Sequence, residues 1–364
     1  MSREWFNKQS IKARPKKIEN IYNKTKEEVD IMNNNKILTV SVDAGKGYTK
    51  WAYAEEVVGV NKEGKQVTKD KWTTGIELSS VKKGEADFGS TTYINGEPYN
   101  FNGTIKMVEH SDKSKDNDEH KALMQKTLFD ISVETGIEDF NVIMCISLDQ
   151  FKVEENVIQM QKNMLEKEFI IKQTVKDKEI EKTIRIHNLV IEPEALVSTR
   201  YAKTKFKNVE QAVLVDIGTL NVGLVPLEGG RFEREDVTAP RIGYDNMLDM
   251  FKEYSDSHKA NYPKKLLSAY VDRKQGQHEE LDKLFSSFFK EKYAPLLKDE
   301  INKKGFGEFA TLVFLGGTSS KCKDLIEENF KEYEGIEVIT DIFATAKGAY
   351  KKGIKDLEKI KGGR

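Results

Sequence analysis

Cysteine is scarce in this chain, and its scarcity excludes two common kinds of structural site. The 364 residues include two cysteines, Cys145 and Cys322, which stand far apart in apolar or mixed runs. Neither cysteine has the spacing of a metal ligand, which argues against a zinc site and against a disulfide scaffold. We therefore expect two reduced, structural thiols in a cytosolic protein.

Long apolar runs and net charge are also lacking. No apolar run reaches the ~18 residues that a membrane span needs, and no signal-peptide pattern opens the chain, so we expect a cytoplasmic protein. The formal net charge is -1, which gives no field that favours direct binding to nucleic acid or to acidic membranes. With 38% hydrophobic and 33% charged residues, the composition is typical of a globular protein long enough for two domains.

Two polar segments carry little periodicity. Residues 1–35 are lysine-rich, with one weak helical face, and we interpret them as a loosely docked or partly disordered extension. A helix that packs on the body or on a neighbouring subunit is the alternative. The charge-dense segment of residues 111–121 is expected to be a solvated surface.

The rest of the chain alternates between strand and helix patterns. Strand-like runs flank a glycine turn after Lys36 and recur near residues 71–76 and 91–94. Further along, the patterns predict a helix at 122–135, a buried strand run at 141–151, a helix at 153–166, a hairpin at 168–186, a strand and helix at 189–203, a hairpin at 212–232, helices within 244–302, a strand and helix at 311–330, and a last helix at 343–361.

The run VSVDAGKGYTK, residues 40–50, places a carboxylate at the end of a strand and two glycines in the turn after it. A site for polyphosphate and Mg²⁺ needs backbone amides that can approach closely, and carboxylates that face the metal. Asp43, Gly45 and Gly47 fit that need, and Lys50 can reach phosphate from the next strand. A plain hairpin turn is the alternative interpretation.

Two later segments extend this hypothesis. VLVDIG, residues 213–218, repeats the VSVDAG pattern, and this weak duplication favours two similar α/β halves that face each other. LVFLGGTSSK predicts a Gly316–Gly317 turn that opens a helix, where backbone can lie flat against a nucleotide. Each of these segments is also compatible with an ordinary turn, but their order and spacing together are more specific.

The segment LVIEPEAL supplies a fourth element. Pro193 ends a strand, and the carboxylate beside it would project from the start of a helix, a suitable place for a general base or a residue that positions water. Glu192 and Glu194 compete for this role. An acid that complements the helix dipole is the alternative.

These motifs resemble those of the actin superfamily, and more closely those of the ParM-type plasmid-segregation actins of bacteria. The resemblance spans roughly residues 37–354 and rests on DAGKGYTK, DIGTLN, FLGGTSSK, TIRIHNLVIEPEAL, FATAKGAYKKG and ISLDQFKVEENVIQMQKNML, where Ser147 replaces an expected proline. It implies an α/β, actin-like fold of the duplicated ribonuclease H-like type, with a nucleotide cleft between two domains. The domains would be residues 36–205, completed by the C-terminal helix 341–364, and residues 206–340, after the polar extension 1–35.

The resemblance also implies residue roles. Asp43 and Asp216 would hold Mg²⁺ through water, and Lys50 would neutralise charge as the terminal phosphate leaves. Glu194 would position the attacking water, although the chaperone branch of the superfamily favours Glu192. The remaining nucleotide contacts would come from Gly45, Lys46, Gly47, Tyr48, Thr49, Gly218, Thr219, Leu220 and Asn221 at the phosphates, from Gly316, Gly317 and Thr318 at the adenosine, and from Asp245 and Asn246 at the ribose.

The implied function is a filament-forming ATPase or GTPase that moves plasmid DNA through a DNA-bound adaptor of the ParR type. The chain would contact itself and the adaptor, DNA only indirectly, and no membrane. Two alternatives stay open: a sugar or acetate kinase of the same fold, and another cytoskeletal filament. The sequence contains no recognisable motif for a sugar pocket.

Overall fold

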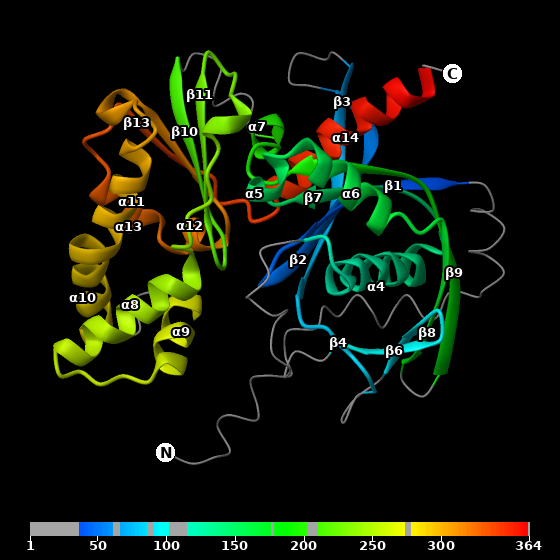
Figure 1. The fold of residues 1–364 in the computed structure, drawn as a ribbon, viewed down its shortest axis with the longest axis horizontal. Helices are drawn as coiled ribbons and strands as arrows, with labels where there is room; N and C mark the ends of the chain where they lie inside the picture. The colour runs from blue at the N-terminus through cyan, green and yellow to red at the C-terminus, as the bar shows by residue number, and fades with distance from the viewer. Residues whose placement is uncertain are drawn as a thin grey trace.

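The computed structural model describes residues 36–60, 66–85, 91–101, 115–175, 178–201, 210–273 and 278–362. The extension expected over residues 1–35 lies outside the described residues, as do residues 176 and 177 at the tip of an expected hairpin. The described chain is built on two β-sheets that stand side by side (Figure 1).

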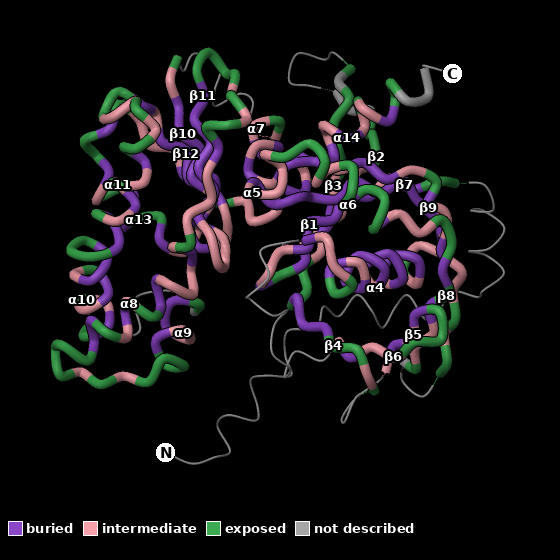
Figure 2. The backbone as a smooth tube through the Cα atoms, in the orientation of Figure 1, coloured by how far each residue is buried: buried purple, intermediate pink, exposed green. Residues whose placement is uncertain are grey.

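The first sheet has the strand order β3-β2-β1-β7-β9-β8-β5-β6-β4. Its strands are β1 (Ile37–Ala44), β2 (Tyr48–Val60), β3 (Gln66–Leu78), β4 (Lys82–Lys83), β5 (Thr92–Ile94), β6 (Glu97–Asn100), β7 (Asp139–Ile146), β8 (Glu168–Val175) and β9 (Lys178–Pro193). At its centre β1, β7 and β9 run parallel, and β2 returns antiparallel beside β1. β1 and β7 are buried along most of their length, as expected for parallel strands covered on both faces (Figure 2).

Two long helices cover opposite faces of this sheet. Side chains alternate along β7, so Val142 and Met144 pack in the same core as Leu128 of α4 (Asp118–Thr135), while Cys145 packs with Leu357 of α14 (Ala344–Gly362). Shorter helices complete this part of the chain: α5 (Leu148–Phe151), α6 (Glu154–Met164) and α7 (Ser198–Tyr201). We call this sheet with α4 to α7 and α14 the first-sheet half.

The second sheet has the order β11-β10-β12-β13, and its strands are β10 (Gln211–Ile217), β11 (Val222–Glu228), β12 (Thr311–Leu315) and β13 (Gly335–Val338). One face packs against helices through an aromatic core that includes Phe251, Phe285 and Phe314. These helices, which with the sheet form the second-sheet half, are α8 (Tyr244–Ser257), α9 (Lys264–Arg273), α10 (Glu279–Phe288), α11 (Ala294–Asn302), α12 (Gly317–Lys321) and α13 (Lys323–Asn329), with short helical segments at Arg234–Asp236, Phe289–Tyr293 and Gly307–Phe309.

The two halves repeat one motif, as the sequence duplication predicts. In each half the first strand of a hairpin pairs antiparallel with the second strand and parallel with a later strand: β1 with β2 and β7, and β10 with β11 and β12. Asp43 and Asp216 are each the second-last residue of the first strand. The alternating strands and helices that the sequence predicts are therefore confirmed as a mixed α/β fold with an internal repeat.

A smaller core joins the halves. Leu148, Ala195 and Ala344 of the first-sheet half pack with Leu214 and Val225 of the second-sheet half in one buried cluster. Because Ala195 follows Glu194 directly, this contact fixes the glutamate against the second-sheet half. Apolar packing between the halves thus sets the position of a charged residue.

One expected strand ends earlier than the sequence suggests. The strand run predicted over residues 141–151 stops at Ile146, and Leu148–Phe151 form one helical turn instead, with the Phe151 amide donating to the Ser147 carbonyl at 2.9 Å. The Ser147 hydroxyl also bonds Gln150 Oε1 at 2.9 Å, a local contact that competes with strand pairing. Among the described helices, none combines the length and the apolar character that a membrane span requires.

Candidate functional site

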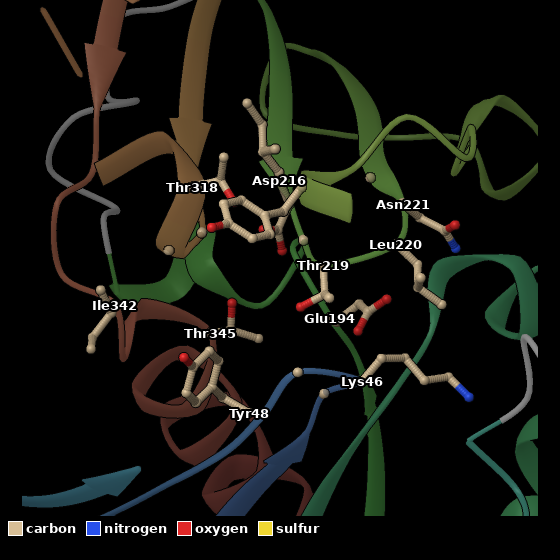
Figure 3. Close-up of a pocket in the computed structure, with 18 of the residues that line it drawn as sticks. Lys46, Tyr48, Glu194, Asp216, Thr219, Leu220, Asn221, Thr318, Ile342 and Thr345 are labelled. Atoms are coloured by element: carbon tan, nitrogen blue, oxygen red, sulfur yellow. The ribbon is translucent and has the colours of Figure 1, made fainter. Parts of the chain in front are cut away.

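A cavity of about 680 Å³ lies where residues of both halves meet (Figure 3). Figure 3 shows Tyr48 and Thr219, one from each hairpin turn, around the same space as Glu194 and Asp216. Sixteen of the residues that the sequence singles out line it: Asp43, Gly45, Lys46, Gly47, Tyr48, Lys50, Glu194, Asp216, Gly218, Thr219, Leu220, Asn221, Asp245, Gly316, Gly317 and Thr318. Motifs up to 275 positions apart in the chain therefore face one cavity, from Asp43 to Thr318.

Three expected residues lie outside the cavity lining. Thr49 is buried, and its hydroxyl bonds the Ser79 hydroxyl at 2.9 Å. Asn246 belongs to the first turn of α8 but does not reach the cavity. Glu192 is buried in β9, where its Oε1 lies 3.4 Å from the Lys352 ammonium of α14.

The two hairpin turns have the same backbone hydrogen bonds. The Gly45 amide donates to the Asp43 carbonyl at 3.0 Å and to the Tyr48 carbonyl at 3.1 Å. The Gly218 amide donates to the Asp216 carbonyl at 3.1 Å and to the Asn221 carbonyl at 3.0 Å, so the spacing along the chain is identical. Because the Gly45 and Gly218 amides are bonded inside their own turns, donors for a phosphate must come from the other residues of the turns, a narrower set than the sequence suggests.

The second turn is held in place by the start of α8. The amides of Gly243, Tyr244 and Asp245 donate to the carbonyls of Leu220, Gly218 and Thr219, each at 2.9 Å. The first turns of a helix carry amides without partners inside the helix. Here those amides fix the turn against the cavity, which explains why a loop with a single glycine keeps a defined shape.

Glycine is required where β12 meets the second turn. Gly316 has φ of 94°, and a Cβ there would lie 2.5 Å from Asp216 Oδ1 and 2.8 Å from the Ile217 carbonyl. Gly317, which opens α12, would place a Cβ in open space. Gly316 thus lets β12 approach Asp216 closely, while Gly317 presents bare backbone to the cavity.

Charged groups gather at the centre of the cavity. The Lys115 ammonium lies 3.0 Å from Asp43 Oδ1 and 2.7 Å from Glu194 Oε2. Burial raises the pKa of Asp43, but the Lys115 and Lys50 ammonium groups outweigh it and leave that pKa below its usual value. Burial and the nearby Glu194 carboxylate raise the pKa of Asp216 to about 7.

Comparison with solved structures identifies this architecture. Alp7A, an actin-like protein, superposes with a TM-score of 0.65 over 90% of this chain and 99% of its own, at 13% identity. The ADP complex of Ta0583, an archaeal actin homolog, gives 0.61 over 88% and 100%, at 15% identity. The chain has an actin-like fold. A ParM filament from Clostridium botulinum, with 15 strands, shares this actin-like fold at a TM-score of 0.59, over 89% and 100% of the chains, at 15% identity.

Sequence comparison covers less of the chain. Residues 41–196 match the family described as "Actin like proteins N terminal domain". No curated protein sequence matches the chain significantly. The matched stretch includes the first hairpin and ends just past Glu194, so the expected actin-like fold is confirmed by the solved structures over most of the chain, and by sequence over its first part.

Within this actin-like fold, Lys115 is a cavity residue that the sequence analysis missed. The segment around it was predicted to be solvated surface, and for Lys115 that prediction is wrong, because only 4% of its side chain is exposed. The sequence does contain one usable signal nearby. Asn117 precedes two acids and caps α4, with its side chain accepting from the His120 amide, so the start of a helix was predictable here, although the burial of the lysine was not.

The structure separates the two candidate glutamates. Burial raises the pKa of Glu192 to about 7, and the residue lies in β9 against α14. Glu194 follows the strand, its amide donates to the Ile146 carbonyl at 2.9 Å, and its carboxylate lines the cavity. Ala195 after it has φ of 58°, a left-handed conformation that is unusual for a residue with a Cβ and often found at functional sites.

A polar cluster that the sequence analysis also missed lines the cavity on α8, α9 and α12. The Tyr244 hydroxyl donates to Asp272 Oδ1 at 2.9 Å, and the Lys321 ammonium lies 2.6 Å from the same oxygen. Lys321 also stands over the Tyr244 ring, 5.0 Å from its centroid. Lys321 follows the Gly316–Gly317 turn in the quoted motif, which was the signal available for it.

The donor set suits a magnesium nucleotide. Among the described residues, no group of three or more His, Cys, Asp or Glu side chains forms a ready cage for a metal ion. Mg²⁺ keeps several waters and is usually held by one or two carboxylates together with substrate phosphates. Asp43 and Asp216 offer such carboxylates, and the buried Asn221 Oδ1 has no partner within the described structure, so it is free to accept a hydrogen bond from a ligand or water.

Proposed function

We propose that this chain is an actin-like nucleoside triphosphatase that binds ATP or GTP with Mg²⁺ and assembles into filaments. One observation carries the proposal: Asp43 and Asp216, at equivalent strand ends of the two sheets, line a single cavity together with Glu194. Solved proteins of the same fold support it, since one is an ADP complex and another is a filament.

Asp43 and Asp216 are the proposed magnesium ligands, each acting through water. Bound Mg²⁺ supplies positive charge that offsets the negative charge of the phosphates. Lys50 is paired with Asp43 across the β1–β2 hairpin and lines the cavity, so its ammonium balances charge as the terminal phosphate leaves. Amides of Lys46, Gly47 and Tyr48, and of the second turn, donate to phosphate oxygens.

Glu194 is the proposed water-positioning residue. Its carboxylate accepts a hydrogen bond from the attacking water and orients that water toward the terminal phosphate. Glu192 does not take this role, because it is buried against Lys352 outside the cavity. Gly316, Gly317 and Thr318 lie against the nucleoside, with Asp245 at the ribose, whereas Asn246 lies outside the cavity lining.

The proposal includes the wider organisation and role of the protein. Residues 36–205 with the helix 341–364 form one domain, and residues 206–340 form the other, with the nucleotide between them. Filaments of the chain engage a DNA-bound adaptor of the ParR type and move plasmid DNA in the cytoplasm, without contact with a membrane. ParM and AlfA filaments of the same fold support the assembly step.

The test replaces Glu194 with glutamine and follows phosphate release and light scattering together. We expect hydrolysis to fall by about 100-fold or more, while nucleotide binding and assembly survive. Glu192→Gln is the matched variant, since it removes a carboxylate two residues away, and it should keep hydrolysis within a few-fold. Equal hydrolysis in the wild type and Glu194→Gln would contradict the assignment.

Two further measurements distinguish the proposed function from the alternatives. A kinase of the same fold would release ADP faster when a sugar or acetate is added, whereas the proposed triphosphatase would release ADP and phosphate at the same rate without either addition. Electron microscopy with and without ATP or GTP tests assembly directly. A protein that binds nucleotide but stays monomeric under all these conditions would contradict the filament proposal.

A further inference from the structure

A second cavity, of about 420 Å³, lies in the second-sheet half and takes no part in the proposed nucleotide site. Pro226 at the end of β11, Phe232 in the segment after it and Phe306 in the loop after α11 give this cavity apolar walls. Of the described residues, none lines both cavities. We call the second cavity the groove.

The groove carries an excess of negative charge. Four carboxylates line it, against three cations. One of these cations, Lys303, is already paired with two acids of α11, at 2.9 and 2.7 Å. Most of the acids come from residues 228–236, EGGRFERED, in which Arg234 is engaged over the Phe151 ring, 4.3 Å from its centroid. Apolar walls with an acidic rim suit a partner that is both apolar and basic.

The segment between α8 and α9, with the start of α9, has this character. Residues 258–266, HKANYPKKL, hold three lysines and no acid, although Lys264 pairs with Asp249 of α8. Leu266 is 42% exposed, whereas the next residue, Leu267, is buried in the core. We call residues 258–266 the tip. An exposed leucine among lysines gives the tip the properties that the groove lacks.

The tip and the groove lie at opposite ends of the second-sheet half. Figure 1 shows α9 at one end of this half, and β11 and β13 near the other. The tip also has a defined shape, because the amides of Lys259 and Ala260 donate to carbonyls at the end of α8, at 2.9 and 3.0 Å. Two surfaces fixed at opposite ends of one half do not meet within a single molecule, but they can meet between two molecules.

We propose that the groove of one molecule receives the tip of the next, so that second-sheet halves stack head to tail along a filament. The inference rests on the proposed function, which includes assembly. Leu266 enters between Phe232 and Phe306, and the lysines of the tip face the carboxylates of the groove. A contact between two different surfaces is heterologous, and it continues as an open chain unless the rotation closes it into a ring.

The experiment uses two variants, each with one altered surface. The tip variant is Lys259→Asp with Asn261→Asp, at φ of 59° and 49°, where aspartate tolerates the left-handed backbone. The groove variant is Glu233→Lys with Glu235→Lys. Each variant alone sets like charges against each other at every junction. We therefore expect its critical concentration for assembly, measured by pelleting with Mg²⁺–AMPPNP, to rise at least about 10-fold.

An equal mixture of the two variants should assemble again. The unaltered groove of the tip variant meets the unaltered tip of the groove variant, and the two altered surfaces carry opposite charges. We expect alternating filaments with a critical concentration well below that of either variant alone. Variants that assemble like the wild type, or a mixture that assembles no better than its components, would overturn the inference. Loss of assembly in the groove variant alone would assign the groove to a different partner and overturn it as well.

The apolar part of the contact has its own test. Leu266→Asn removes the exposed leucine, and Ile170→Asn is the matched control, because Ile170 is 46% exposed on β8 of the other half. We expect the critical concentration to rise several-fold for Leu266→Asn and to stay unchanged for Ile170→Asn. Equal effects of the two substitutions would count against a specific role of Leu266 and overturn this contact.

Nucleotide affinity separates this inference from the proposed function. The substituted residues lie outside the lining of the nucleotide cavity, whereas Lys264 and Lys265 of the tip belong to it and are left unchanged. All variants should therefore keep the wild-type affinity for Mg²⁺–AMPPNP, which also shows that they fold. A wild type that binds nucleotide but never assembles would overturn the filament proposal together with this inference. A wild type that assembles, beside variants that assemble equally well, would overturn the inference alone.

Discussion

The two hairpin turns of this protein share a backbone but differ in charge. In both, an aspartate is the second-last residue of a strand. The amide two residues later donates to the carbonyl of that aspartate and to the carbonyl three residues further on. Yet the pKa of Asp43 is lowered by Lys115 and Lys50 against the effect of burial, whereas burial and Glu194 raise that of Asp216 to about 7. The duplicated backbone has kept its geometry, and the side chains around it give each aspartate a different task.

This difference suggests a division of labour between the halves. In the first-sheet half, Asp43 lies beside Lys115 and Glu192 beside Lys352. The second-sheet half presents Asp216 to the cavity, where burial and the Glu194 carboxylate raise its pKa to about 7. On this account Asp43 belongs to a preformed ion pair, and Asp216 is the carboxylate available to bind the metal ion.

Replacing Asp216 should give the largest effect on binding. We expect Asp216→Asn to lower magnesium-dependent nucleotide affinity by about 100-fold, because it removes a carboxylate that no buried ion pair compensates. The free protein should not be destabilised, since the substitution also relieves repulsion from Glu194. Calorimetric titration with and without Mg²⁺, together with a urea unfolding curve, measures both quantities; unaltered affinity would count against a metal role.

Replacing Asp43 should lower the free energy of unfolding more than replacing Asp216 does. Asp43→Asn removes one partner of a buried ammonium, and breaking such a pair costs about 3–5 kcal/mol of the free energy of unfolding. Glu194 still pairs with Lys115, so the lower part of that range is expected. Urea unfolding of the two asparagine variants side by side tests the contrast, and equal stability of the two would erase the distinction between the hairpins.

The pH dependence of stability tests the environment of Glu192. The Lys352 ammonium lowers the pKa of this carboxyl group less than burial raises it. Burial raises the pKa of Glu192 to about 7, while Lys352 lowers it and Asp356 raises it further. A carboxyl group whose pKa is higher in the folded protein contributes its full stabilisation at a pH below 4.5, its pKa in the unfolded chain. This contribution is lost as the pH rises through about 7, its pKa in the folded protein.

From this shift we expect stability to fall by up to about 3 kcal/mol between pH 4.5 and about pH 8 on account of Glu192. Urea unfolding at a series of pH values measures the slope. Glu192→Gln should remove this part of the slope, whereas a slope identical in both proteins would show that Lys352 already holds Glu192 ionised.

Glycine substitutions give the smallest expected effects. Gly316→Ala forces a Cβ against Asp216 at a φ of 94°, and a strained residue of this kind costs about 1–3 kcal/mol. Gly317→Ala meets nothing within 4 Å and should change stability little. Thermal unfolding compares the pair, and equal midpoints would mean that β12 does not need its close approach to Asp216.

Much of the fold could be predicted from the sequence. The strand that ends in aspartate, the glycine spacing and the duplicated VSVDAG and VLVDIG patterns are local features, and local features set the hairpins. The short helix at Leu148–Phe151 was missed, because the apolar pattern of the strand continues to Leu148, whereas the strand ends at contacts of Ser147 with Gln150 and Phe151.

The candidate site was only partly predictable. Turn residues and strand-end acids follow from sequence motifs, but the burial of Lys115 depends on Asp43, which lies 72 positions earlier. Glu192 and Glu194 flank the same proline, and what separates them is the end of β9 at Pro193 and the left-handed Ala195 beyond it. Long-range pairing and backbone conformation of this kind leave no periodic signal in the sequence.

The central claim is that the aspartates of both hairpins act on one magnesium–nucleotide complex. A double-mutant cycle with Asp43→Asn and Asp216→Asn, read out as the affinity for Mn²⁺–AMPPNP, tests it most directly. Two residues that share a ligand should be coupled by at least about 1 kcal/mol, so the double variant should bind more tightly than the sum of the single effects predicts. Additive losses within about 0.5 kcal/mol, or no loss in either single variant, would contradict the account.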